Sequence, residues 1–428
     1  MTEAQLDSAL EKMIGDNGVK VPGLGVIIFK DGIEIYSKFL GRRIIGENEK
    51  SVTRHTKFRA ASVSKMFTVF TIMQLVERGK ISLDADVDEY LNFKLRNPHF
   101  PQKKITVRML ASHTSTLRDG KIYSIPPNVG IEEFFKVDGE FYEGGAHFGE
   151  EENFFTYSNL NYGILGTIIE AVTGVRFDIY QRENILAQLE TTADYVPANL
   201  SRSDFELLGA VYQKKNPAGV WNEFGDWYVK ADDFKNIQPP HDTIFLQNPY
   251  DENFQLSYSL KNYRAGKNAT VFSPQGGLRI SFEELAHTLE MFMNSGNFHG
   301  KKILDAESIA EILTPQWIYD DKNGNTYGGS ILNYGLGVYF INGKTSSRVC
   351  KNYEINLVGH TGVAFGMMSG LFFIPNTKTG FLYMMNGAAI SENEDSQSYG
   401  KFSGNYIWEE NLMDAVCNFL MNNELSIG

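Results

Sequence analysis

The chain has 428 residues, with 40 lysines and arginines against 52 aspartates and glutamates, a formal net charge of -12, and two cysteines. A chain of this length buries a core without cross-links, and Cys350 and Cys417 lack the spacing of a disulfide scaffold or a zinc ribbon. A chain with this excess of acidic residues lacks the basic surface that nucleic-acid binding requires, and we therefore expect no nucleic-acid partner.

The longest apolar stretches, Leu160 to Ile169 and Gly362 to Ile374, contain glycines and polar residues. Both are shorter than the roughly 20 residues that a membrane-spanning helix needs, so we expect no transmembrane segment. The first residues, Met-Thr-Glu-Ala-Gln-Leu-Asp, show no basic segment followed by an apolar one, which argues against a signal peptide. As the sequence stands we expect a cytoplasmic protein, or an extracytoplasmic one if a signal peptide has been removed.

Both ends of the chain combine a helix with a pair of strands. The periodicity of apolar residues and the turn signals predict helices over residues 3–15 and 408–423, and strands over 24–29, 33–41, 369–374 and 381–386. Lys30-Asp31-Gly32, between two apolar runs, is a hairpin signal. We expect the two ends to share one antiparallel sheet.

The middle of the chain is predicted to be mainly helical, with helices over residues 63–77, 106–112, 160–172 and 282–294. Residues 215–272 hold many aromatic residues among prolines, asparagines and acids, without sustained periodicity. Because this number of aromatic residues argues against disorder, we expect an ordered loop region. It is either functional or an insertion that only packs on the helical part.

A first candidate for chemistry is Ser62-Val63-Ser64-Lys65, at the start of an apolar helix. Side chains at i and i+3 are neighbours on a helix, so the amine of Lys65 can take the proton of the Ser62 hydroxyl if its pKa is lowered. The positive end of the helix dipole disfavours the ammonium form. A second Ser-x-x-Lys match, Ser398 to Lys401, precedes no apolar helix, and we attribute it to chance.

A second candidate is Tyr157-Ser158-Asn159, just before a predicted helix. A phenol can transfer protons if neighbouring cations lower its pKa, and the Asn159 amide could bind a substrate carbonyl. The alternative is a capping loop with a core tyrosine. A third candidate is the glycine-rich segment 359–366, whose backbone N–H groups can bind an oxyanion, although its His360, taken alone, is more often structural.

The order Ser-x-x-Lys, Tyr-x-Asn and His-Thr-Gly resembles the serine β-lactamase and D-alanyl-D-alanine carboxypeptidase family, in the branch with class C β-lactamases, D-aminopeptidases and related esterases. The resemblance covers nearly the whole chain except the aromatic insertion. Further segments resemble that branch in the same order: Pro22-Gly23, Phe58 to Lys65, Leu110 to Ser115, Gly276 to Leu278 and Tyr334 to Gly337.

The resemblance implies Ser62 as the acylated nucleophile, with Lys65 and Tyr157 as the proton-transfer pair. Asn159, His360, Thr361 and Gly362 would bind the substrate. The backbone N–H groups of Ser62 and Val363 would form the oxyanion hole.

The sequence departs from the family pattern in two places. His360 stands where many members have a lysine, and a histidine is mostly neutral at pH 7, which weakens a pure β-lactamase interpretation. Thr116 stands where the branch often has glycine. A Lys-Thr-Gly triplet does occur at residues 378–380, but it falls in a turn one strand beyond the glycine-rich segment, and we interpret it as a chance match.

We therefore expect an α+β protein of the β-lactamase/transpeptidase type. Residues 1–60 and 300–428 would form an antiparallel sheet flanked by helices, and residues 61–299 a mainly helical lobe, with the active site at their junction. The expected activity is a serine hydrolase that forms an acyl-enzyme on amide bonds of D-amino-acid-containing peptides or related amides, with a small-molecule or peptide substrate, no cofactor and no metal. The alternatives are a carboxylesterase or acyltransferase of the same fold, or a non-catalytic penicillin-binding or regulatory homologue.

Overall fold

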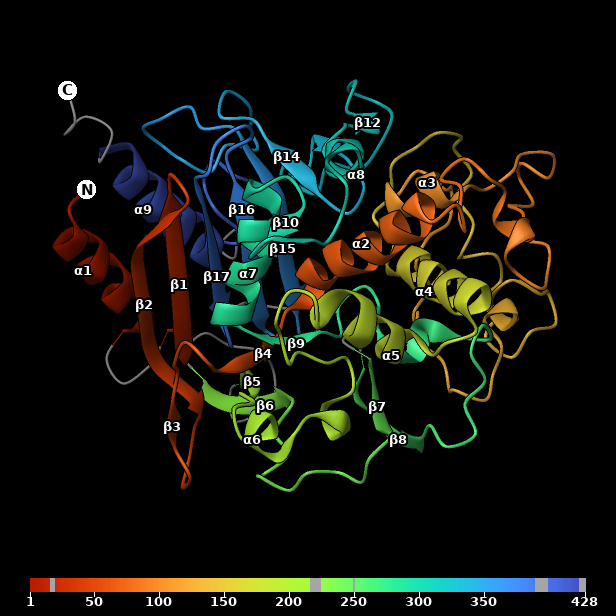
Figure 1. Cartoon of the computed structure of the whole chain (residues 1–428), viewed down its shortest axis with the longest axis horizontal. Coiled ribbons are helices and arrows are strands. Elements are labelled where there is room, and N and C mark those ends of the chain that lie inside the picture. Colours follow the sequence, from red (N-terminus) through yellow and green to blue (C-terminus); the bar gives the residue numbers. More distant parts are fainter. Residues whose placement is uncertain (16–19, 216–224, 249–250, 389–398, 423–428) are drawn as a thin grey trace.

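The computed structural model describes residues 1–15, 20–215, 225–248, 251–388 and 399–422 (Figure 1). It has the expected α+β class: one large antiparallel sheet with helices on both faces, and a largely helical part beside it. The lobe boundaries near residues 60 and 300 stay a prediction.

The large sheet joins strands from the two ends of the chain. Their spatial order is β12 (Trp317–Ile318), β13 (Asn333–Tyr334), β14 (Tyr339–Ile341), β15 (Leu357–Ala364), β16 (Met367–Phe373), β17 (Gly380–Met385), β1 (Gly23–Lys30), β2 (Ile33–Ile44) and β3 (Lys50–Ser51). In its middle, Val26 of β1 pairs with Tyr383 of β17 on one side and with Lys38 of β2 on the other. The predicted sharing of one sheet is confirmed.

The β1–β2 hairpin follows from its turn residues. Asp31 and Gly32 both have positive φ, 52° and 80°, which the tight turn of a hairpin requires and which Asp-Gly adopts readily. The eight residues of β1 are buried except Lys30, as expected for a strand in the interior of a sheet covered on both faces.

Helices cover both faces of the sheet (Figure 1). Their bounds are α1 (Glu3–Ile14), α2 (Ser64–Glu77), α3 (Val107–Ala111), α4 (Asn159–Thr173), α5 (Phe177–Gln181), α6 (Arg202–Phe205), α7 (Phe282–Met293), α8 (Ala306–Ile312) and α9 (Ile407–Asn422). The terminal helices α1 and α9 pack together on one face, and α7 packs on β1, β16 and β17 on the other.

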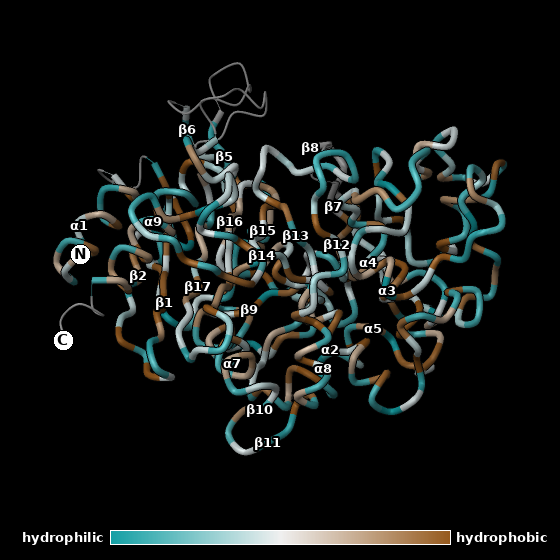
Figure 2. Tube along the Cα trace, turned by 90° about the horizontal axis from the view of Figure 1, so that it is seen from above, coloured by the Kyte–Doolittle hydropathy of each residue, from teal (hydrophilic) through white to brown (hydrophobic). Residues whose placement is uncertain are grey.

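The sheet therefore separates two hydrophobic cores. One lies under α1 and α9, and it includes Leu6 and Leu10 of α1, whose spacing of four residues places them on one face of the helix. The other lies among α2, α4 and α7, where every residue of α2 from Ser64 to Leu75 is buried. In Figure 2 the hydrophobic stretches run mainly along the inner elements and the hydrophilic ones along peripheral loops.

The region 215–272 differs from the expected loop. Its described part contains strands in two hairpins, β5 (Val211–Lys215) with β6 (Asp226–Ala231) and β7 (Thr243–Asn248) with β8 (Asp251–Ser259). Residues 216–224 and 249–250 lie outside the described residues. These strands were not predicted because about half of their residues are polar. Their alternation of apolar and polar residues therefore does not stand out from the prolines and asparagines between them.

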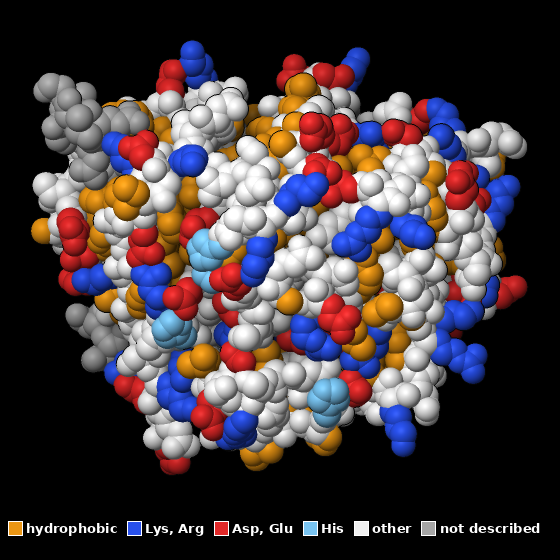
Figure 3. Space-filling view, viewed as in Figure 1, with side chains coloured by type: hydrophobic (Ala, Val, Ile, Leu, Met, Phe, Trp, Pro, Cys, Tyr) orange, Lys and Arg blue, Asp and Glu red, His pale blue; other side chains and the backbone are white. Residues whose placement is uncertain are grey.

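Within the described residues, no helix is long and apolar enough to cross a membrane. The face shown in Figure 3 carries acidic and basic side chains interspersed, as the moderate net charge leads one to expect.

A buried ion pair fastens the short sheet of β4 (Lys57–Arg59) and β9 (Arg279–Ser281) to α7. Lys57, 2% exposed, donates to both oxygens of Glu284 at 2.6 and 2.7 Å. Glu284 also completes the capping box of α7 by accepting from the backbone N–H of Ser281 at 2.8 Å. Because β4 leads directly into the segment that carries Ser62, this pair anchors one side of that segment.

Glu284→Ala is expected to lower the free energy of unfolding by about 3 kcal/mol, because the buried Lys57 ammonium loses the carboxylate that accepts its two shortest hydrogen bonds and keeps only the carboxylate of Asp204, at 3.5 Å. Guanidinium unfolding followed by tryptophan fluorescence measures this change. The neighbouring Glu283→Ala removes a carboxylate that is 42% exposed and is expected to cost less than about 1 kcal/mol. Equal losses in the two variants contradict the anchoring role.

Candidate active site

Ser62 lies at the point where β4 passes into α2 through a short 3-10 turn, Ala61–Val63. Ala61 has φ of 46°, a left-handed conformation that costs energy for a residue with a side chain and is often kept at functional sites. Ser62 is half-buried whereas both neighbours are buried. The other hydroxyl of the motif, Ser64, is buried and accepts from the backbone N–H of Leu278 at 3.2 Å, so it does not face the cleft.

The Lys65 amine sits among neutral oxygens. Its Nζ lies 3.1 Å from Ser62 Oγ, 2.9 Å from Asn159 Oδ1 and 3.2 Å from the backbone oxygen of Gln275. Burial lowers the pKa of Lys65 to about 7, against a smaller opposing effect of Asp119. At neutral pH a large part of the protein therefore carries an uncharged amine beside the serine hydroxyl.

Tyr157 completes the proton-carrying group. The Lys65 Nζ lies 4.6 Å from the centre of its ring, and its hydroxyl lies 3.5 Å from His360 Nε2. Loss of solvent raises the pKa of Tyr157 well above 10, only partly offset by its hydrogen bond with Ser62. The lowered pKa on which the sequence argument depended is thus absent, and the phenol stays protonated in the free protein.

Asp119 is a site residue that the sequence analysis missed. Its carboxylate accepts from the backbone N–H groups of Asn159 (2.9 Å) and Leu160 (2.8 Å), from Ser158 Oγ (3.0 Å) and from Asn159 Nδ2 (2.8 Å). It caps the start of α4 from another segment, where a negative charge is favoured by the helix dipole. By holding the amide nitrogen of Asn159, it turns Oδ1 toward Lys65. In the sequence, Asp119 and Gly120 look like an ordinary turn, and nothing near them indicates a contact with Asn159.

His360 lies on β15 and is 2% exposed. Its Nε2 is 3.0 Å from the hydroxyl of Tyr334, and its Nδ1 hydrogen-bonds the backbone oxygen of Thr361. Burial and the neighbouring Lys65 lower the pKa of His360 to about 3, so the imidazole is neutral. Thr361, the next residue, is half-buried and accepts from the hydroxyl of Tyr339 at 3.1 Å.

Strand β15 runs close to Ser62 because residue 362 has no side chain. A Cβ at Gly362 would lie 2.6 Å from the backbone oxygen of Ala60 and 2.8 Å from the nitrogen of Ser62. Ser369 of β16 fixes the same segment by donating to the Ala60 oxygen at 2.6 Å. Val363, 38% exposed, follows at the open edge of the cleft.

A second missed residue, His113, supports Tyr157 from behind. Its Nδ1 accepts from the backbone N–H of Ser158 at 3.1 Å, and its ring centre lies 4.3 Å from that of Tyr157. Burial lowers the pKa of His113 well below 6.5. Three residues on, Thr116 has φ of 66°, so the chain keeps the backbone conformation that glycine favours at this place of the family pattern.

The structure thus brings together Ser62, Lys65, Tyr157, Asn159, His360 and Gly362, with Thr361 and Val363 on the adjoining strand surface. The Lys378-Thr379-Gly380 triplet lies elsewhere: Gly32 of the β1–β2 hairpin donates to the Lys378 oxygen. Ser398 of the second Ser-x-x-Lys match lies outside the described residues. In the described part of the chain, no group of three His, Cys, Asp or Glu side chains could hold a metal ion.

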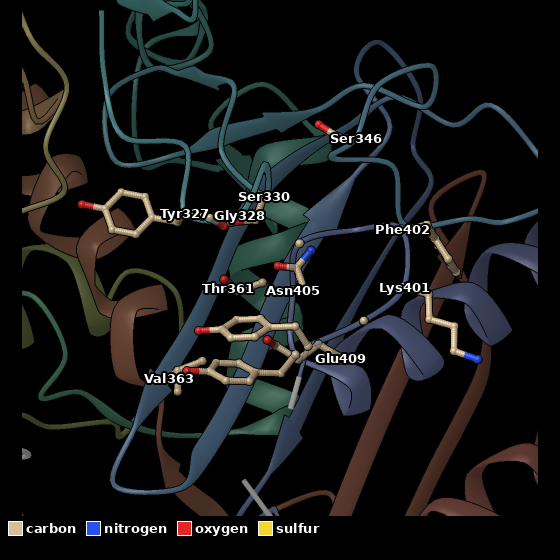
Figure 4. Close-up of a pocket in the computed structure, with 14 residues that line it drawn as sticks. Tyr327, Gly328, Ser330, Ser346, Thr361, Val363, Lys401, Phe402, Asn405 and Glu409 are labelled. Atoms are coloured by element: carbon tan, nitrogen blue, oxygen red, sulfur yellow. Dashed lines mark hydrogen bonds between the residues drawn. The ribbon is translucent and has the colours of Figure 1, made fainter. Parts of the chain in front are cut away.

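A cavity of ≈ 770 Å³ continues from the exposed side of β15 (Figure 4). Thr361 and Val363 form one wall, the segment Tyr327 to Ser330 another, and residues 399–409 before and at the start of α9 the third. A cavity of this size accepts a ligand of several residues or rings, so the cleft continues beyond the reacting group.

Gly362→Ala is expected to slow the labelling of Ser62 by a fluorophosphonate at least about 100-fold, because the new methyl group pushes β15 away from the nucleophile. Gly276→Ala is the matched control, since a Cβ there meets no backbone atom closer than 3.6 Å. Intact-protein mass spectrometry over time gives both rates. Labelling of Gly362→Ala at the rate of the unmodified protein contradicts the close-approach argument.

A sequence model of the β-lactamase family matches residues 10–403. Among curated relatives, protein flp of Staphylococcus aureus (strain MRSA252) is 24% identical over 238 residues, which cover 53% of this chain and 44% of that protein, so this chain spans less than half of that relative's length. The N-acetylmuramyl-L-alanine amidase of Bacillus subtilis (strain 168) is 26% identical over 332 residues, covering 72% of this chain and 67% of that protein.

A class C β-lactamase from Rhodobacter sphaeroides has the same fold, with a TM-score of 0.63 and 16% sequence identity over 98% of this chain and 99% of that one. The match of the family model spans nearly the whole chain and includes the predicted site residues. The chain therefore belongs to the β-lactamase family, a family of serine hydrolases.

Proposed function

We propose that the protein hydrolyses amide bonds of D-amino-acid-containing peptides or related amides through an acyl-enzyme on Ser62. The observation that carries the proposal is the buried amine of Lys65, with a pKa of about 7, placed 3.1 Å from the Ser62 hydroxyl. A base with a pKa near the working pH is well matched to general-base catalysis.

In the proposed first step, Ser62 Oγ attacks the substrate carbonyl carbon and its proton passes to Lys65 Nζ. The negative charge on the carbonyl oxygen is stabilised by the backbone N–H groups of Ser62 and Val363. The protonated amine then returns the proton to the leaving nitrogen through the Tyr157 phenol, and the C–N bond breaks. Because that phenol is protonated in the free protein, it acts as a relay and not as the initial base.

In the second step a water molecule attacks the acyl carbonyl carbon and gives one proton to Lys65 Nζ. That proton passes to Ser62 Oγ as the ester C–O bond breaks, which frees the carboxylic acid and restores the serine. Lys65 and Tyr157 are the groups in reach of this serine, so the same pair serves both steps. Asn159 already uses its Oδ1 to hold Lys65, and its contact with a substrate amide remains a proposal. Asp119 is proposed to keep Asn159, and through it Lys65, in place.

The amide preference rests on two arguments. The name of the Bacillus subtilis relative describes an amidase, and this relative is matched over most of this chain. In addition, the neutral His360 offers no fixed positive charge to a substrate carboxylate, which disfavours a β-lactam or a peptide held by a terminal carboxylate next to β15.

A stoichiometric covalent adduct of a fluorophosphonate is expected on the protein and absent from Ser62→Ala. A fluorescent penicillin is expected to form its adduct more slowly, because its carboxylate meets no fixed positive charge beside β15. Intact-protein mass spectrometry detects it, and fragment mass spectra locate it. Ser64→Ala is the matched control, because its hydroxyl is buried and bonded to Leu278, and it is expected to keep the adduct. Absence of any adduct with both reagents contradicts the catalytic proposal, and an adduct that survives in Ser62→Ala contradicts the choice of nucleophile.

The rate constant for acylation of Ser62 is expected to rise with pH and to level off above a pKa of about 7. Only the uncharged amine accepts a proton, so each pH unit below that pKa removes about nine-tenths of the active form. His360, with a pKa of about 3, and Tyr157, whose pKa is far above neutral, do not titrate in this window. Stopped-flow acylation across about pH 5.5–9 measures the profile, and a rate independent of pH contradicts Lys65 as the base.

A further inference from the structure

The cavity beside β15 has walls rich in aromatic rings. The rings of Tyr399 and Tyr406 stack with their centres 5.0 Å apart and their planes 14° from parallel, and Phe402 follows on the same segment. Tyr327, 44% exposed, lines the cavity from the other loop, and its hydroxyl accepts from the backbone N–H of Tyr157 at 2.9 Å. The aromatic walls thus begin next to the catalytic tyrosine.

The cavity also contains a carboxyl group, that of Glu409 in the first turn of α9. The side chain is almost fully buried and accepts from the hydroxyl of Tyr383 at 2.7 Å. Burial raises the pKa of Glu409 to about 8, opposed only by hydrogen bonds from Tyr383 and the backbone of Tyr406. Among the described residues, no Lys, Arg or His side chain lowers the pKa of Glu409.

Two basic residues lie near the cavity. The Arg348 guanidinium lies over the ring of Phe402, 5.7 Å from its centre, so that ring already has a cation on one face and the proposed site uses the tyrosine rings. Lys401 lies at the rim, and Figure 4 shows its side chain extending away from Thr361. Its backbone is held in place because Glu410 accepts from the N–H groups of Lys401, Phe402 and Ser403 at 2.8, 3.0 and 2.9 Å. His360, behind the wall formed by β15, is neutral.

We propose that this cavity binds an ammonium group of the substrate, primary or methylated, between its aromatic faces and the carboxyl group of Glu409. The face of an aromatic ring attracts a cation. Because its pKa is raised to about 8, Glu409 is mostly protonated at neutral pH until a cation binds. A cation beside it favours the ionised form, so Glu409 releases its proton to solvent as the ammonium binds, and the pair then forms a charge-assisted contact. The proposal names a feature of the substrate and so rests on the function proposed above. It favours peptides or amides with a free amine in this position over those with a terminal carboxylate.

The test compares three probes of nearly the same shape: choline, the neutral 3,3-dimethylbutan-1-ol and the anionic 3,3-dimethylbutanoate. Dissociation constants are measured on the full chain by isothermal titration calorimetry at one pH and ionic strength. Choline is expected to bind at least about tenfold more tightly than the neutral alcohol, and the anion most weakly.

Glu409→Gln and Tyr399→Leu are expected to reduce the advantage of choline over the alcohol several-fold. Asp414→Asn is the matched control, because this carboxylate of α9 lies outside the cavity and accepts from the backbone of Lys351. If Glu409→Gln loses its native circular dichroism, Tyr399→Leu decides the question alone, since its ring is only half-buried.

Equal affinities for choline and the alcohol in the unmodified protein overturn the proposal, as does an advantage that both cavity variants retain. Binding of the probes needs no turnover, so this result is separate from the labelling of Ser62. Labelling without choline preference contradicts the ammonium site alone, and choline preference without labelling contradicts the hydrolase proposal alone.

Discussion

The arrangement at Ser62 depends on excluding water from the Lys65 amine. An ammonium group in this position would have neutral oxygen partners and no carboxylate in contact, so burial shifts its equilibrium toward the free amine. Three features keep the amine uncharged. The core around α2 excludes water, and the rings of Tyr157 and Tyr162 cover the amine. The carboxylate of Asp119 does not touch the amine, because Asn159 lies between them. A carboxylate in direct contact with Lys65 would favour the ammonium form, which cannot accept a proton.

The site combines residues from two kinds of element that share one core. Ser62 lies in the 3-10 turn before α2 and Lys65 in the first turn of α2, while His360 and Gly362 belong to the large sheet. The two meet where the backbone of Ala60–Ser62 lies against Gly362 and where the Ser369 hydroxyl donates to the Ala60 oxygen. Contacts through the backbone and one short side chain vary less than contacts between long side chains, which suits a geometry that must hold to a fraction of an ångström.

Local sequence signals were sufficient for much of the fold. Helix α2, the β1–β2 hairpin and the strands at both ends were predicted from periodicity and turn residues, and the structure confirms them within one to three residues at most ends. The motifs indicated Ser62, Lys65 and Tyr157. The roles of Asp119, His113 and Tyr334 could not be found this way, because their contacts join residues 26 to 45 positions apart. His113 and Tyr334 fall within segments that resemble the family, but the local sequence does not show what their side chains contact. The hairpins of residues 211–259 were missed since polar residues interrupt their alternation.

The contact between His360 and Tyr334 has a consequence for substitution at position 360. Both side chains are fully enclosed, and the Tyr334 hydroxyl lies 3.0 Å from the imidazole nitrogen. A lysine at position 360, as many relatives of this family have, would place a longer and charged side chain against that phenol in a space already filled. Replacing His360 by lysine alone is therefore expected to cost packing against Tyr334. A lysine is accommodated at position 360 only if the residue at position 334 becomes smaller as well.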